Sequence, residues 1–243
     1  LELGLDDIFY HHLEVASDLN LSDLLRVSLD SKIDELFFEL RRYALDLKGL
    51  TAEQSDRLLS YGERLNVRIV QTKLVSRGLF AEVVDATDII ETDDKFGEAS
   101  PNMEKTAKYA NDLLLPMVAD GKIPVVTGFI GATRSGKITT LGRGGSDYTA
   151  SILGKVLEAK EVWIWTDVDG VYTSDPRKDP DARLLTKLSQ VKGHQIAIEG
   201  ARVLYPKTVE PLIGTDITLR VKNTFNPNNE GTRIYRKLGG DGK

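Results

Sequence analysis

The sequence predicts an α/β protein, a three-layer α/β/α sandwich with a mainly parallel sheet. Two observations support this fold class. The first 80 residues carry apolar side chains at helical spacing, and from Ala81 onward short β-rich runs alternate with helical segments. Alternation of strands and helices favours a parallel sheet with helices on both faces. No internal repeat or low-complexity segment argues against this prediction.

The amino-terminal part is predicted to be helical. Apolar residues recur at helical spacing between charged ones at Ile33, Leu36, Phe37 and Leu40. Another helix is predicted over residues 52–77, because Thr51 and Gln54 have the spacing of a capping box. Gly78 follows it, and glycine is the usual residue just past the end of a helix.

The rest of the chain reads as alternating elements. Strands are predicted over residues 81–86, 124–128, 162–166 and 217–221, and a hairpin over residues 129–141. Helices are predicted over residues 103–119, 146–157, 187–200 and 206–213. Pro116 predicts a kink or an early end in the first of these helices. Trp163 and Trp165 share one face of their strand, and core packing is the expected reason for both.

Composition and charge exclude several classes of protein. Of the 243 residues, 41% are hydrophobic and 28% are charged, a globular balance that excludes disordered and fibrous chains. The net charge of −5 does not provide the broad basic surface of a nucleic-acid-binding protein. We therefore expect no nucleic acid among the partners.

The absence of cysteine excludes disulfides, thiolate metal sites and thiol nucleophiles, and it is compatible with a cytoplasmic location, which we expect. The longest apolar-leaning stretch, residues 123–132, is far shorter than the roughly 20 residues that span a bilayer, so no membrane partner is expected. The chain starts without Met and without a basic segment, so residues upstream of Leu1 are expected.

A glycine-rich segment, Thr140 to Asp147, is the first candidate site. Its glycines allow backbone N–H groups to approach an anion, and Ser146 or Asp147 is expected to cap the following helix. Helix N-termini favour anions, and the Arg143 guanidinium matches a carboxylate or a phosphate. The alternative is a glycine-rich turn that only caps a helix.

A polar segment from Trp165 to Arg177 is the second candidate. It begins at the carboxyl end of a predicted strand, where open α/β sheets bind ligands. The alternative is a solvated turn, because Asp175-Pro176 is a turn signal. The third candidate is Glu63, which could face a ligand ammonium if Gly62 allows a close approach, or could simply be solvated.

These segments together resemble aspartokinase. The match is strong in Thr140–Asp147 and Thr166–Arg177, and it continues through residues 94–97, 128–131, 200–206 and 221–227. It covers the chain from about residue 50 to residue 234. The loop after Thr166 also occurs in relatives such as uridylate kinase, so the segment from Gly142 to Asp147 is what points to aspartokinase within the amino acid kinase superfamily.

The resemblance implies one catalytic domain over residues 1–236. Its amino-terminal lobe, to about residue 130, would bind aspartate, and its carboxy-terminal lobe, about residues 131–236, would bind nucleotide. Residues 237–243 would form a loose tail. A homodimer is expected, because members of this superfamily commonly dimerise.

The implied reaction moves the γ-phosphoryl group of MgATP to the β-carboxylate of L-aspartate, the first step in making lysine, threonine and methionine. ATP and Mg²⁺ are therefore the implied cofactors, with Mg²⁺ arriving on the nucleotide rather than at a metal site of the protein. Catalysis of this kind consists mostly of positioning and charge stabilisation.

Residue roles follow from the resemblance. The implied substrate-binding residues are Glu63, Arg143, Gly144, Gly145 and Ser146. Arg143 and Asp147 are the implied catalytic residues. Arg143 would bind a carboxylate of aspartate, Ser146 would donate to it, Glu63 would hold the ammonium, and Asp147 would orient the catalytic lysine or the acceptor. The implied nucleotide-binding residues are Thr166, Asp167, Tyr172, Asp175, Arg177 and Arg202.

Two departures keep other functions open. The Lys-Phe-Gly-Gly segment that supplies the family's catalytic lysine has no counterpart here, and Arg202 stands where the family commonly has lysine, with a different donor geometry. The regulatory domains that follow in many aspartokinases are also not expected. The alternatives are another kinase of the superfamily, of the uridylate or acylglutamate type, and a non-catalytic nucleotide-binding assembly module.

Overall fold

The computed structural model describes residues 2–174, 179–200 and 203–236. It divides into two compact units, Leu1–Gly142 and Arg143–Lys243, and each is described by itself. Both units combine helices with strands, so the α/β fold class is confirmed. No helix within the described ranges is long and apolar enough to cross a membrane.

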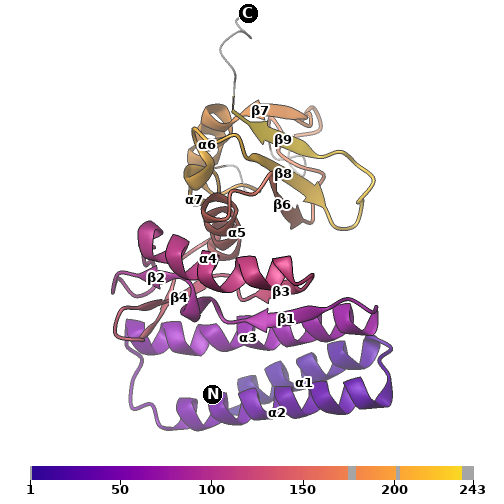
Figure 1. The fold of residues 1–243 in the computed structure, drawn as a ribbon, viewed down its shortest axis with the longest axis vertical. Helices are drawn as coiled ribbons and strands as arrows, with labels where there is room; N and C mark the ends of the chain where they lie inside the picture. Colours follow the sequence, from indigo (N-terminus) through magenta and orange to yellow (C-terminus); the bar gives the residue numbers. More distant parts are fainter. Residues whose placement is uncertain (1, 175–178, 201–202, 237–243) are drawn as a thin grey trace, which may run out of the picture. The chain divides into compact units, whose positions relative to one another are not determined.

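Three helices begin the first unit: α1 (Glu2–Asp18), α2 (Asp23–Leu45) and α3 (Ala52–Ser76). Consecutive helices of this set pack on each other, as Figure 1 shows. The buried side chains of α2 lie at the predicted helical spacing: Leu29, Ile33, Phe37, Leu40 and Ala44. At the start of α3, Thr51 and Gln54 form the predicted capping box, and Gly78 beyond its end has a φ of +79°.

The strands of the first unit form two small sheets. In one, β1 (Ala81–Val84) pairs in parallel with β3 (Ile123–Val126). In the other, β2 (Glu91–Thr92) pairs in parallel with β4 (Ile130–Thr133), which forms the predicted hairpin with β5 (Ile138–Thr140). The 3-10 helix η1 (Ala86–Asp88) connects β1 to β2.

The helix α4 (Met103–Ala119) precedes β3 and passes through Pro116. The alternative of an early end at this proline is therefore wrong. Proline removes one backbone donor, which leaves the carbonyl of Asp112 without its helical partner. Asp112 and Pro116 are both exposed, so water can satisfy that carbonyl at little cost.

The second unit is built on a four-stranded sheet with the order β6-β8-β9-β7. These strands are β6 (Glu161–Thr166), β7 (Lys187–Ser189), β8 (Thr218–Asn223) and β9 (Thr232–Tyr235). The helices are α5 (Gly145–Val156), α6 (Gln190–Ile198), α7 (Pro206–Val209) and the 3-10 helix η2 (Glu210–Leu212). Figure 1 shows α6 and α7 beside this sheet.

Three details of the predicted sheet are wrong. The strands of the described residues form three separate hydrogen-bonded groups rather than one sheet. The segment 187–200 is not helical throughout, because its first three residues form β7, which pairs with the unexpected strand β9. Leu188 and Ile234 on these two strands are buried in the core, and this burial explains the pairing.

The two tryptophans share one face of β6 as predicted, but that face is not the core. Val162 and Ile164 point into the core of the second unit, whereas Trp163 and Trp165 are 42% and 46% exposed. Core packing is therefore the wrong explanation for them. Their rings instead make cation–π contacts with residues of β8. The guanidinium carbon of Arg220 lies 4.7 Å from the ring centre of Trp163, and the ammonium nitrogen of Lys222 lies 5.6 Å from the ring centre of Trp165.

Candidate active site

The glycine-rich segment forms a bend in which two glycines have left-handed backbones. Gly142 ends the first unit with a φ of +81°, and Gly144 has a φ of +72°. A Cβ on Gly144 would lie 2.5 Å from Cδ2 of Tyr205, so both backbone and packing require glycine there. Gly144 is also the N-cap of α5, and no side chain makes a cap hydrogen bond.

The predicted capping by Ser146 or Asp147 is therefore wrong, because both residues lie inside the first turn of α5. A helix start without a side-chain cap leaves its first backbone N–H groups available to another acceptor. Together with the partial positive charge of the helix N-terminus, these groups favour an anion. Gly145, the first helical residue, is buried, and Ser146 beside it is exposed.

Arg143 is positioned by Tyr205 within the second unit. Its Nε donates to the Tyr205 hydroxyl at 3.1 Å, and its guanidinium carbon lies 5.3 Å from the centre of the Tyr205 ring. Tyr205 is thus in contact with both Arg143 and Gly144. In the sequence, Tyr205 stands out only as part of a segment that resembles the family. Its role in orienting Arg143 could not be predicted from that segment.

Asp147 has a half-buried carboxylate in the first turn of α5. In the described part of the chain, no side chain or backbone group donates a hydrogen bond to it. Burial raises the pKa of this carboxyl above its ordinary value, because it disfavours the charged form. A perturbed carboxylate beside a helix N-terminus is a feature of functional sites.

Replacing Asp147 with asparagine is expected to raise the urea midpoint of unfolding at pH 7. Because the pKa is raised in the folded chain, ionised Asp147 costs stability above its unfolded pKa and costs none below it. The gain should therefore shrink as the pH falls through the raised folded-state pKa towards about 4, and should be absent below that pH. Urea titrations of both proteins across this range test it, and a variant less stable than the parent at pH 7 would contradict the assignment.

The acidic loop after β6 is ordered by residues from β8 and β9. One carboxylate oxygen of Asp169 accepts from the side-chain amides of Asn223 at 2.8 Å and Asn226 at 3.1 Å. Gly170 has a φ of +145°, and a Cβ there would lie 2.5 Å from Oγ1 of Thr232. Sequence reasoning did not assign roles to these asparagines, although they lie in a segment that matches the family.

The predicted nucleotide-binding residues lie in and after this loop. Thr166 ends β6 and its hydroxyl donates to the Asp167 carboxylate at 3.3 Å. Tyr172 forms an isolated antiparallel bridge with Leu184, and burial, together with the Asp169 charge, raises the pKa of its phenol. The other three predicted residues, Asp175, Arg177 and Arg202, lie outside the described residues.

The start of α5 and the end of β6 lie at the same edge of the sheet. The helix and the strand are joined by a short turn and run in opposite directions, with Gly154 packed on Val162. From that contact the helix extends back about 14 Å to Gly145, and the strand extends forward about 13 Å to Thr166. These lengths place the glycine bend and the acidic loop towards the same edge of the second unit's sheet.

Glu63 belongs to the first unit, where it lies half-buried on α3. Its neighbour Gly62 has open space where a Cβ would be, so no described protein group approaches it, and the expected close approach of a ligand stays a prediction. The buried carboxylate among the described residues of α3 is instead that of Asp56, which is 1% exposed. Its carboxylate accepts from the backbone N–H groups of Gly97 and Thr140, each at 2.8 Å.

The segment 128–131 carries a backbone strain that the sequence does not reveal. Phe129 has a φ of +69°, which is uncommon for a residue with a bulky side chain. A Cβ on Gly131 would lie 2.8 Å from the carbonyl oxygen of Ile90, so this position requires glycine. Strained residues cluster at functional sites, and this segment matches the family.

Comparisons with known proteins show the family of this chain. The sequence pattern of the amino acid kinase family matches residues 17–223. Lysine-sensitive aspartokinase 3 of Escherichia coli is 38% identical over 183 residues, which are 75% of this chain and 40% of that protein. Aspartokinase 1, chloroplastic, of Arabidopsis thaliana is 36% identical over 228 residues, or 93% of this chain and 39% of that protein.

The solved structures give the same result. A crystal structure of E. coli aspartokinase III in complex with aspartate and ADP superposes with a TM-score of 0.89 at 32% sequence identity. The match covers 97% of this chain and 52% of that one. This chain thus spans about 40% of the length of the curated relatives named above. The chain belongs to the amino acid kinase family.

Proposed function

We propose that this chain carries the substrate sites of an ATP-dependent aspartate kinase. The β-carboxylate oxygen of L-aspartate attacks the γ-phosphorus of ATP, the bond from that phosphorus to the β–γ bridging oxygen breaks, and 4-phospho-L-aspartate and ADP are formed. This is the first step of lysine, threonine and methionine synthesis. The observation that carries the proposal is the glycine bend with Arg143 at the same edge as the loop after β6.

The aspartate side of the site is assigned to the glycine bend. Arg143 binds a carboxylate of aspartate through its guanidinium, while Ser146 and the backbone N–H groups of Gly144 and Gly145 donate to it. The support is that Tyr205 orients Arg143 and that α5 begins without a side-chain cap. Glu63 is assigned to the substrate ammonium. Asp147 orients the acceptor or the catalytic lysine.

The nucleotide side is assigned to the acidic loop. Thr166, Asp167 and Tyr172 line it, and Asp175, Arg177 and Arg202 are assigned to it from the resemblance. The carboxyl edge of a sheet is where α/β proteins bind nucleotides. The E. coli structure that this chain resembles contains aspartate and ADP, which supports the same pair of ligands here.

Mg²⁺ fits the carboxylates of this edge. Mg²⁺ usually takes one or two carboxylates together with phosphate oxygens and water. Asp167 is exposed directly after β6, at the edge assigned to the nucleotide. It would add a carboxylate ligand to an Mg²⁺ ion that arrives on the nucleotide, and the ion would supply charge neutralisation at the transferring phosphoryl group.

Three further expectations belong to this proposal. The amino-terminal lobe, to about residue 130, binds aspartate, and the rest, to residue 236, binds nucleotide. The protein acts as a homodimer. It works in the cytoplasm, an expectation that depends on the cysteine-free composition.

A hydroxylamine-trapping assay for acyl phosphate tests the proposed reaction. It is run with MgATP and L-aspartate on the 243-residue chain, and on the same chain preceded by a Lys-Phe-Gly-Gly strand. Product in either form supports the proposal, and product only in the second assigns the missing cation to that strand. Separate reactions with uridylate and N-acetylglutamate test the rival kinases. Phosphorylation of uridylate or N-acetylglutamate but not of L-aspartate, or no product with any of the three acceptors in either form of the chain, would contradict the proposal.

A further inference from the structure

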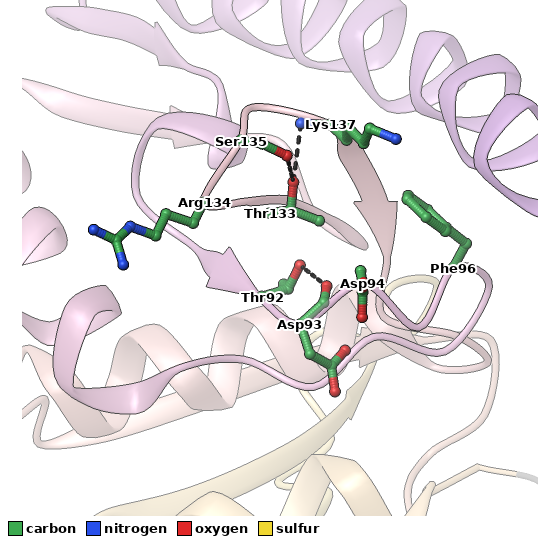
Figure 2. Close-up of a pocket in the computed structure, with 8 residues that line it drawn as sticks. All are labelled: Thr92, Asp93, Asp94, Phe96, Thr133, Arg134, Ser135 and Lys137. Carbon is green, nitrogen blue, oxygen red and sulfur yellow. Dashed lines mark hydrogen bonds between the residues drawn. The ribbon is translucent and has the colours of Figure 1, made fainter.

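A pocket of about 500 Å³ lies in the first unit, and none of the residues assigned to the reaction lines it. It opens where β2 and β4 end, since these parallel strands pair Thr92 with Thr133 and the residues that follow each strand line the pocket. Figure 2 shows these two walls. The carboxyl edge of parallel strands is a common place for ligands, and the volume is in the range of small-molecule sites.

The two walls carry opposite charges. Asp93 and Asp94 follow β2, whereas Arg134 and Lys137 belong to the hairpin that follows β4. The Asp93 carboxylate already has hydrogen-bond partners. It accepts hydrogen bonds from the backbone N–H groups of Lys95 at 3.3 Å and Ser100 at 3.0 Å. Asp94 is exposed, and its carboxylate makes no hydrogen bond or ion pair with the described residues, although its backbone carbonyl accepts the Phe96 N–H at 3.0 Å. It is therefore the carboxylate available to a ligand.

On the basic wall, the available cation is Arg134. Lys137 is already paired with Glu53 at 2.7 Å, whereas Arg134 is exposed and has no ion pair within the described ranges. Figure 2 shows the two side chains leaving the hairpin in different directions. Arg134 extends away from Asp94 and Phe96 in this view. Because it is exposed and Lys137 is paired with Glu53, Arg134 is the cation of these two that is free to turn towards a ligand anion in the pocket.

Two hydroxyls stand beside Arg134. The Thr133 oxygen accepts the backbone N–H of Lys137 at 3.1 Å and lies 3.0 Å from the Ser135 hydroxyl. The Thr133 and Ser135 hydroxyls each carry one proton, and the hydrogen bond between them uses one of these two protons. The second proton remains available to an acceptor in the pocket. Phe96 borders the same space and offers an apolar surface.

We propose that this pocket binds a free α-amino acid with an apolar side chain. Its ammonium pairs with Asp94, its carboxylate pairs with Arg134 and accepts the free hydroxyl proton, and its side chain contacts Phe96. The pocket's lining does not include Glu63, the residue of the first unit that is assigned to aspartate. Lys137 pairs with Glu53 at the start of α3, and Glu63 lies ten residues further on, about 15 Å along the helix axis.

Calorimetric titration of the 243-residue chain tests this site. The probes are L-phenylalanine, L-leucine, L-methionine and L-valine, added singly. We expect at least one to bind with a Kd on the order of 1 mM. N-acetyl-L-phenylalanine and L-phenylalaninamide each lack one of the two charges, so both should bind more weakly than L-phenylalanine.

Two variants locate the binding. Asp94→Asn and Arg134→Gln should each weaken binding at least about tenfold, since each removes one charge pair. Glu39→Gln, which removes an exposed carboxylate on α2, should leave binding unchanged. No heat from any probe at about 10 mM, or equal binding by both pocket variants, would overturn the proposal. L-Aspartate is left out of the probes, so failure here does not affect the proposed kinase activity.

Discussion

Replacing Asp56 with alanine is expected to lower the free energy of unfolding by about 3 kcal/mol or more. Asp56 is 1% exposed, and its carboxylate accepts from the backbone N–H groups of Gly97 and Thr140 and from the Thr140 hydroxyl, each at 2.8 Å. The substitution leaves the two buried donors of Thr140 without an acceptor, whereas the N–H of exposed Gly97 can bond to water. Each unsatisfied buried donor costs about 1–3 kcal/mol. Urea unfolding of variant and parent measures the loss.

Two control variants show whether the loss of stability is specific to Asp56 or follows from removing any carboxylate on α3. Glu53 lies on the same helix, and its side chain is 43% exposed and paired with Lys137. Glu53→Ala should cost less than about 1 kcal/mol, as is usual for a surface ion pair. Asp56→Asn should fall between, because its amide oxygen still accepts a hydrogen bond. Equal losses for Asp56→Ala and Glu53→Ala would contradict the role given to Asp56.

The second large effect is expected at Arg143. Arg143→Ala should raise the KM for L-aspartate at least about tenfold, because it removes a charge-assisted contact to a carboxylate. The KM for ATP should change less than about twofold, since the nucleotide is assigned to the loop after β6. Initial rates in the acyl-phosphate assay, with each substrate varied in turn, give both constants. Unchanged aspartate saturation would contradict the role of Arg143.

Tyr205→Phe examines how Arg143 is positioned. The variant keeps the ring that packs on Gly144 and removes only the hydroxyl that accepts from Nε of Arg143. We expect a rise in the aspartate KM of about two- to threefold, which is smaller than for Arg143→Ala. A change in the KM for ATP of the same size would indicate a general structural effect, and would contradict a positioning role.

Local signals in the sequence predicted the elements that depend on neighbouring residues. The Thr51 and Gln54 capping box and the glycine after α3 are examples, since their partners lie within a few positions. The glycine bend before α5 was also predicted, because its chemistry lies in consecutive residues. Its N-cap was assigned to the wrong residue, since a left-handed glycine at Gly144 replaces a side-chain cap.

The features that the sequence did not predict depend on distant partners. Asp56 resembles a solvated helical carboxylate, but Gly97 and Thr140 are 41 and 84 positions away. The short strands β7 and β9 form because each pairs with the sheet, not because of their own sequences. The alternation of β6 predicted that its tryptophans share a face. Which face is buried depends on the core that forms on its other side.

Paramagnetic relaxation of bound L-aspartate tests the central claim most directly. The chain is mixed with Mn²⁺, a non-hydrolysable ATP analogue and L-aspartate labelled with ¹³C at either carboxyl carbon. If the glycine bend and the loop after β6 form one substrate site, Mn²⁺ on the phosphates should relax the β-carboxyl carbon more strongly than the α-carboxyl carbon, and Arg143→Ala should abolish the effect. Binding of both ligands without enhanced relaxation of either carbon would contradict the account.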